Sequence, residues 1–308
     1  HIPKNITALV IVKDFRALDL PLMQKTHACN GKIIYDQCDN IFSKEKKTID
    51  KITQTMSNVS HLLDAVVTPT NSLAESFRKN GHDKLDISVI PDIAITKSEE
   101  YDAIKALSKH TKTVRGIFRF PQYGWADRLP NSESPIQHTK ENKLKKLVWF
   151  GTARSKYGRT GLDLLKEIIP DLNTVQTYCP FELVIVSNKP RIFQAFFNNG
   201  HSCFPVKYCP WSIGNTYSAL EFADAVLLPV SNDEFGRTKS NNRAILALSA
   251  DVPVITNKHP SYRKLEDGLF MKNNYETWTE TIISALSDQE LIQKKLNMSK
   301  SIINRSYS

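Results

Sequence analysis

The chain has 308 residues, of which 41% are hydrophobic and 24% charged, so it can build the cores of two domains rather than one. No run approaches the roughly 20 apolar residues that span a bilayer, and the first residues lack the pattern of a signal peptide. The net charge of +9 favours acidic partners, but the basic residues are dispersed, which is typical of a solvated surface and argues against a nucleic-acid binder.

The first part of the chain alternates short β-branched runs with helical periods. Strands are predicted over residues 8–12, 32–36, 65–69 and 87–91, and helices over 18–29, 43–61 and 71–80. Short strands that alternate with helices form parallel sheets with helical crossovers. We therefore expect an α/β domain over residues 1–95.

This alternation stops between residues 96 and 143. Residues 101–109 have helical periodicity, whereas 118–125 and 130–142 contain the Pro, Ser, Asn and aromatic residues of irregular segments. We place a linker between two domains here.

Regular alternation returns at residue 144. Strands are predicted over residues 146–151, 182–187, 204–206, 223–229 and 252–255, and helices over 161–169, 191–199, 213–222, 244–250, 275–287 and 289–304. We expect a second α/β domain over residues 144–295, followed by a terminal helical segment over 296–308.

A cationic, polar turn lies between the predicted strand 223–229 and the next helix. It contains Lys239, Ser240, Asn241, Asn242 and Arg243. Anions bind at such a place, because the unpaired N–H groups and the dipole of the helix point at the ligand. An ordinary helix N-cap is the alternative, but two cations and three polar side chains supply more donors than capping requires. The turn predicts a diphosphate site.

A second candidate phosphate loop covers residues 151–161. Its glycines, beginning with Gly151, allow close backbone approach, and Thr152, Arg154 and Ser155 supply donors and charge. It matches neither the P-loop nor the GxGxxG pattern, so alone it is as compatible with a solvent loop. The cationic turn favours the phosphate interpretation, because both loops leave the same sheet edge.

Acidic residues follow a strand of the first half. Asp36 and Asp39 are candidates to hold a metal, orient an acceptor hydroxyl or accept its proton, and an Asx turn is the alternative. Trp211 is a candidate to stack on a base ring, and a place in the core is its alternative.

The five cysteines are scattered, without a CxxC pair. They predict reduced thiols in a cytosolic protein and argue against a zinc site.

These motifs resemble GT-B glycosyltransferases of the family-four type, especially bacterial surface-polysaccharide enzymes. The resemblance is carried by Trp211 and by residues 223–229, 239–243 and 252–255 on the donor side, and by 35–40, 65–73 and 89–92 on the acceptor side. It covers nearly the whole chain apart from residues 96–142.

The resemblance implies two Rossmann-like parallel-sheet domains that face each other across a cleft, with a nucleotide-sugar donor bound mostly by the second. Arg154 and Lys239 would neutralise the diphosphate without an obligatory metal, and transfer would retain the anomeric configuration. We expect Arg243 to stabilise the departing diphosphate with them, and we expect no cofactor. Glu234 resembles the first acidic residue of the Glu-x7-Glu signature, which touches the donor sugar. The terminal helix, which ends near Tyr307, would return to the first domain.

The resemblance also implies an acceptor and a location. The acceptor would be a glycan or a lipid-linked sugar, and Asp36 and Asp39 would face it. Basic charge would let the protein work at the anionic inner face of the membrane without insertion, by itself or within a larger polysaccharide synthase.

Two features depart from the family pattern. The second Glu of the signature is replaced by Asn242 if spacing is counted from Glu234, or by Leu246 if Pro253 anchors the alignment. The first domain starts late, and because residue 1 is His rather than Met, we expect a fragment of a longer chain. A non-catalytic GT-B module and a GT-B nucleotide-sugar epimerase are therefore the alternative functions.

Overall fold

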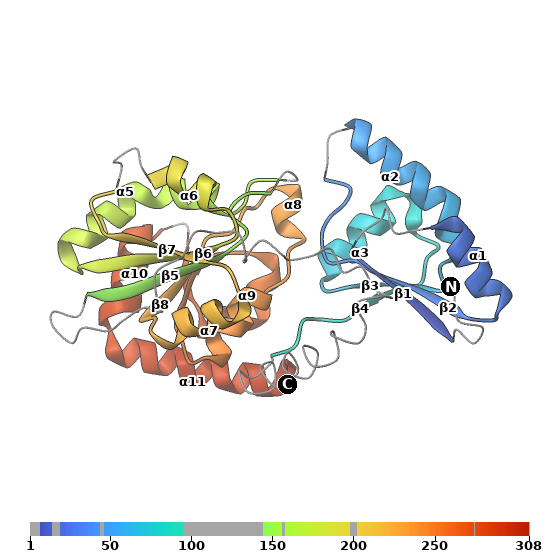
Figure 1. Ribbon diagram of the computed structural model, residues 1–308. Coiled ribbons are helices and arrows are strands. Elements are labelled where there is room, and N and C mark those ends of the chain that lie inside the picture. The colour runs from blue at the N-terminus through green and yellow to red at the C-terminus, as the bar shows by residue number, and fades with distance from the viewer. Residues whose placement is uncertain are drawn as a thin grey trace.

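The computed structural model describes residues 7–13, 19–43, 46–94, 144–155, 158–197, 202–273 and 275–307. These residues form two α/β domains, each built on a parallel β-sheet (Figure 1). The expected two-domain α/β architecture is confirmed. The predicted linker over 96–143 lies outside the described residues, and the predicted domain boundaries stay predictions.

The first domain has a four-stranded sheet in the order β1-β2-β3-β4. The strands are Ala8–Val12, Lys32–Asp36, Ala65–Thr68 and Ile87–Val89. The helices are α1 (Leu20–Ala28), α2 (Lys46–Val59) and α3 (Asn71–Phe77). They cover one face of the sheet (Figure 1), where Met23, Met56 and Phe77 pack on Ile33 and Tyr35. Because all four strands are parallel to their neighbours, their carboxyl ends lie on the same side of the sheet.

The second domain has a six-stranded sheet in the order β10-β9-β8-β5-β6-β7. In chain order, β5 to β10 are Lys145–Gly151, Phe181–Ser187, Val206–Pro210, Ala225–Leu228, Val254–Asn257 and Phe270–Lys272. Every residue of β6 is buried, because helices pack on both faces. The strand order reverses between β5 and β8, and ligands of open α/β sheets bind at such a reversal.

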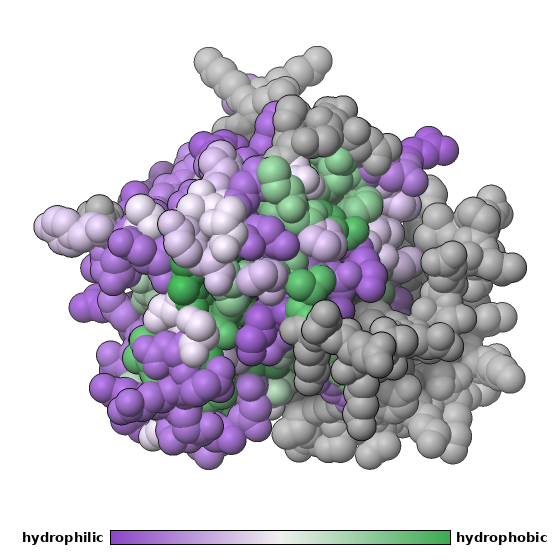
Figure 2. All heavy atoms as spheres, turned by 90° about the vertical axis from the view of Figure 1, so that its left-hand side faces the viewer, coloured by the Kyte–Doolittle hydropathy of each residue, from purple (hydrophilic) through white to green (hydrophobic). Residues whose placement is uncertain are grey.

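Helices cover both faces of the second sheet and give it two hydrophobic cores. On one face lie α5 (Leu162–Tyr178), α6 (Pro190–Phe197) and α10 (Trp278–Ser287). On the other lie α7 (Ile213–Glu221), α9 (Asn242–Ser249) and α11 (Gln289–Ser306). Figure 2 shows the outer side of this domain, where hydrophilic residues predominate and hydrophobic ones are interspersed. In the described ranges, no helix is both long and apolar enough to cross a bilayer.

Several elements differ from the predicted ranges. Helix α5 continues through Pro170 instead of ending before it, because Leu172 and Val175 extend its buried stripe. The strand expected at 204–206 lies at Val206–Pro210. Three elements were not predicted: a short helix α8 (Glu234–Arg237), a 3-10 helix η5 (Pro260–Gly268) and strand β10.

The terminal helix connects the two halves of the chain at one point. It begins at Gln289, and Ile302, Ile303 and Tyr307 pack in a core of the second domain. The carbonyl oxygen of Tyr307 accepts a hydrogen bond of 2.7 Å from the N–H of Ala94, in the segment that follows β4. The chain leaving the first sheet is thus held against the second domain.

Candidate functional site

A cavity of about 970 Å³ lies between the carboxyl ends of the two sheets. Its lining from the first domain includes Lys13, Asp36, Cys38, Asp39, Pro69, Ile90, Pro91, Asp92 and Ile93. Its lining from the second includes Gly151, Thr152, Arg154, Ser155, Lys189, Ser231, Lys239, Ser240, Asn242 and Arg243. Most of these residues directly follow a strand, which is where parallel sheets bind ligands.

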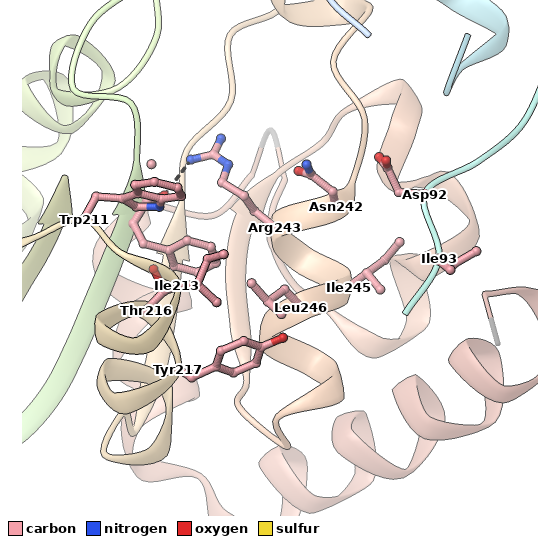
Figure 3. A pocket seen from close by; sticks show the side chains of 12 residues that line it. Asp92, Ile93, Trp211, Ile213, Thr216, Tyr217, Asn242, Arg243, Ile245 and Leu246 are labelled. Atoms are coloured by element: carbon pink, nitrogen blue, oxygen red, sulfur yellow. Dashed lines mark hydrogen bonds between the residues drawn. The ribbon is translucent and has the colours of Figure 1, made fainter. Parts of the chain in front are cut away.

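Arg243 reaches this cavity because two glycines shape the loop after β5. Gly151 has φ +148°, and a Cβ there would lie 2.9 Å from Nη1 of Arg243. That Nη1 donates a hydrogen bond of 3.1 Å to the carbonyl oxygen of Phe150 (Figure 3). Gly161 has φ +70°, and a Cβ there would overlap the carbonyl oxygen of Ala153 at 2.2 Å. The loop therefore folds back tightly and leaves room for the guanidinium of Arg243.

Arg154 lies on the wall of the cavity with its guanidinium paired inside its own domain. Its Nε and Nη2 donate to the two carboxylate oxygens of Asp163 at 3.0 and 2.8 Å. This pairing raises the pKa of Arg154 above its usual value. The carbonyl oxygen of Arg154 accepts a hydrogen bond of 3.2 Å from the ammonium of Lys189, a second cation of the wall.

Lys239 belongs to the second domain and contacts the first. Its ammonium is hydrogen-bonded to the carboxylate of Asp39 in the first domain and lies 4.2 Å from the ring centroid of Phe235. Next to it, the hydroxyl of Thr70 donates to the carbonyl oxygen of Thr238 at 3.0 Å. The cationic turn therefore touches the first domain at two neighbouring positions.

The side chain of His259 contacts the backbone of α8, which precedes the cationic turn. The ring is buried, and its Nε2 lies 2.9 Å from the carbonyl oxygen of Gly236, while Nδ1 lies 2.8 Å from the hydroxyl of Ser261. Burial lowers the pKa of His259, so the ring is held in its neutral form. The backbone of α8 thus has a defined position relative to the cavity.

The structure brings most of the predicted site residues together. Those that line the large cavity are Asp36, Asp39, Gly151, Thr152, Arg154, Ser155, Lys239, Ser240, Asn242 and Arg243. Asn241 and Glu234 line neither this cavity nor the smaller one beside it. Asn241 is buried and its Nδ2 donates to the hydroxyl of Tyr307 at 2.8 Å, so its amide holds the terminal helix. Glu234 is exposed in the first turn of α8.

The smaller cavity, of about 390 Å³, lies between α7 and α9 (Figure 3). Its wall is largely apolar and includes Trp211, Ile213, Tyr217, Ile245 and Leu246. It shares Asp92, Ile93, Gly151, Asn242 and Arg243 with the large cavity. Trp211 is 42% exposed, so its ring is accessible rather than part of the core. The two cavities therefore adjoin, and one is largely apolar while the other is cationic.

Several lining residues were not predicted as site residues from the sequence, among them Lys13, Cys38, Asp92 and Lys189. Lys13 and Asp92 follow β1 and β4, and Lys189 follows β6. Cys38 lies between the two predicted carboxylates, and burial, together with Asp39, raises the pKa of its thiol. These residues could have been predicted from their positions, because each of them follows a strand. Over the described residues, no group of three or more His, Cys, Asp and Glu side chains is placed to hold a metal ion.

No family model and no curated protein matches the sequence. Solved structures match the fold. The trehalose-6-phosphate synthase of Burkholderia multivorans has a TM-score of 0.61 at 12% identity, over 99% of this chain and 69% of that one. The Burkholderia xenovorans enzyme in complex with glucose-6-phosphate has a TM-score of 0.60 at 11% identity, over 99% and 71%. An E. coli structure bound with UDP-2-fluoro glucose has a TM-score of 0.59 at 10% identity, over 98% and 71%.

The chain therefore has the GT-B fold, with two parallel-sheet domains and a cavity between the carboxyl ends of their strands. At these identities the likeness concerns the fold. The family-four surface-polysaccharide subtype has no counterpart among these structures and stays a prediction.

Proposed function

We propose that this protein is a glycosyltransferase that takes a sugar from a nucleotide-sugar donor. The observation that carries the proposal is the convergence of Lys239, Arg243, Arg154, Lys189 and Lys13 on one cavity. These cations come from different elements of both domains. Transfer breaks the bond between the sugar carbon and the diphosphate oxygen, so negative charge grows on the diphosphate. Preorganised cations stabilise that charge as it develops.

The shape of the combined cavity supports one orientation of the donor. The apolar end, with Trp211 and Ile213, suits a base ring. Arg243 and the N-terminus of α9 suit the diphosphate. The sugar then lies toward the first domain, where Asp36 or Asp39 accepts the proton of the attacking acceptor hydroxyl.

The finer parts of the proposal come from the resemblance and from the titles of the similar structures. We propose metal-independent transfer of a hexosyl or pentosyl group with retention, to a glycan or lipid-linked acceptor of surface-polysaccharide synthesis. The net charge of +9 supports work at an anionic cytoplasmic membrane face. UDP-2-fluoro glucose and glucose-6-phosphate in two similar structures make UDP-glucose and a sugar phosphate the next donor and acceptor to test.

A non-catalytic GT-B module within a larger synthase is the second candidate. Two of the cations are already paired, Lys239 with Asp39 and Arg154 with Asp163, and α9 has no carboxylate at Asn242 or Leu246. An epimerase is less well supported, because the described lining of the cavity contains no histidine.

Ligand-induced stabilisation tests the proposal. We expect UDP, GDP, CDP, CMP, ADP or dTDP, or a sugar derivative of one of them, to raise the melting temperature. Ligand at 100 times its Kd adds about 2.7 kcal/mol to the free energy of unfolding. Lys239→Gln should reduce the shift, whereas Lys300→Gln should not, because Lys300 pairs with Asp251 away from the cavity. Binding without release of nucleotide from any donor favours the non-catalytic module, and no shift with any ligand contradicts the proposal.

A further inference from the structure

Asp92 has a carboxylate oxygen without a described partner, at the place where the two cavities meet. It lies in the segment after β4 and lines both the apolar cavity and the cationic one. Its Oδ2 is buried and has no hydrogen-bond partner among the described residues. A buried carboxylate oxygen without a donor is costly, so such a group calls for an explanation. Figure 3 shows the carboxylate turned toward the side of the cavity where Asn242 lies.

The backbone around Asp92 is anchored on both sides. Before it, the N–H of Ile90 donates to the carbonyl oxygen of Thr68 at 2.9 Å, which extends the sheet by one step. After it, the N–H of Ala94 donates to Tyr307 at 2.7 Å, and the hydroxyl of Tyr307 accepts from Asn241. The segment therefore presents Asp92 to the second domain from a fixed position, as a ligand-binding group requires.

The order in which base, ribose and diphosphate are joined in a nucleotide indicates which part of it lies next to Asp92. In a nucleoside diphosphate the ribose joins the base to the phosphates. If the base occupies the apolar cavity and the diphosphate lies at Arg243, the ribose lies at the junction, which Asp92, Gly151 and Asn242 line. Ribose hydroxyls are donors, and an ionised carboxylate is their strongest acceptor among side chains.

We propose that Asp92 binds the ribose hydroxyls of the donor nucleotide. It supplies from the first domain the carboxylate that α9 lacks at Asn242 and Leu246. This inference rests on the proposed function, because it takes the orientation of the donor from it. Its consequence is that Asp92 makes the site selective for ribonucleotides over deoxyribonucleotides.

Calorimetric titrations of the whole chain test this role. The ligands are the tightest binder among UDP, ADP, GDP and CDP, and its 2′-deoxy and 2′,3′-dideoxy forms. Wild-type protein should bind the ribonucleotide roughly tenfold more tightly than the dideoxy form. Asp92→Ala should bind the ribonucleotide roughly tenfold more weakly and the dideoxy form unchanged, so the preference disappears. Asp86→Asn is the charge-matched control, because Asp86 is exposed and lines neither cavity.

The possible results separate the two claims. A preference for the hydroxyl groups that persists in Asp92→Ala, or its absence from wild-type protein, overturns the role of Asp92 and leaves the proposed function standing. Failure of wild-type protein to bind any of the four ribonucleotides overturns both. If Asp92→Ala unfolds, Asp92→Asn tests the role of Asp92 instead. This variant keeps the shape of the side chain and removes its charge, and no described residue hydrogen-bonds to Oδ2 of Asp92. Asp92→Asn should keep the wild-type melting temperature and have a reduced preference for the ribonucleotide over its dideoxy form.

Discussion

The ammonium of Lys239 in the second domain contacts the carboxylate of Asp39 in the first, across the cavity that we assign to the donor. Both side chains are partly exposed, at 35% and 39%, so water screens the pair and its net strength is small. One cation of the cavity is therefore held by a partner that a diphosphate, with its greater charge, can replace. The pair links donor binding to the contact between the domains.

Asp39→Asn should tighten the binding of a nucleoside diphosphate by up to about fivefold. The reason is that an exposed ion pair of this kind contributes about 0.2–1 kcal/mol, and the ligand no longer has to displace it. Calorimetric titration of wild-type protein and the variant measures the change. Asp86→Asn controls for the loss of one negative charge, and weaker binding in Asp39→Asn would mean that Asp39 itself holds the ligand.

Gly151→Ala should weaken diphosphate binding about tenfold. The added methyl group would come within 2.9 Å of Nη1 of Arg243 and would also strain the backbone at φ +148°. Moving the guanidinium removes a charged hydrogen bond from the site. Gly214→Ala in α7 is the control, because a Cβ there meets nothing within 4 Å. Equal affinities for the two variants would show that Arg243 does not bind the diphosphate.

Pro170→Ala should stabilise the protein by about 1–3 kcal/mol. Pro170 is exposed inside α5, where it lacks the N–H of a helical hydrogen bond and its ring disturbs the preceding turn. Urea unfolding measures the gain, and Lys166→Ala on the same exposed side should change stability by less than about 0.5 kcal/mol. A loss of stability in Pro170→Ala would mean that the proline is required for the shape of the helix.

The protein should lose stability below pH 6.5 partly through His259. Burial lowers its folded pKa beneath the ordinary value of 6.5, so the unfolded chain binds a proton at a pH where the folded ring does not. This contribution is fully present above pH 6.5 and is lost as the pH falls through the folded pKa. His259→Gln should flatten the decline in urea-unfolding free energy between pH 7 and pH 5. An unchanged slope would exclude His259. His82→Gln serves as a comparison, because burial also lowers the pKa of this second histidine.

Local pattern predicts the sheets of this fold well, because their strands are short β-branched runs separated by helical periods. Local pattern does not predict the elements whose bounds depend on tertiary packing. The chain continues α5 through Pro170 because Leu172 and Val175 have a core to enter. Strand β7 includes Pro210, which an edge strand tolerates because it has a neighbour on one side only. Strand β10 has three residues, too few to show a period.

The candidate site likewise contains features that the sequence predicts and contacts that it does not. The rule that ligands bind beyond the carboxyl ends of strands predicts the cationic turn and the loop after β5, and both line the cavity. It cannot predict that Asn241 turns inward to Tyr307, which is 66 residues away. Nor can it predict that Asp39 and Lys239, 200 residues apart, form an ion pair. Such contacts depend on how the two domains pack and leave no local pattern.

The most direct test of glycosyltransferase activity is the release of nucleoside diphosphate from nucleotide-sugars, UDP-glucose first, by wild-type protein and by Lys239→Ala. We expect turnover by wild-type protein with at least one donor. We also expect a loss of about tenfold or more in Lys239→Ala, since one cation at a developing charge contributes on the order of 1.4 kcal/mol or more. If Lys239→Ala turned over the same donor as fast as wild-type protein does, Lys239 would have no role in transfer.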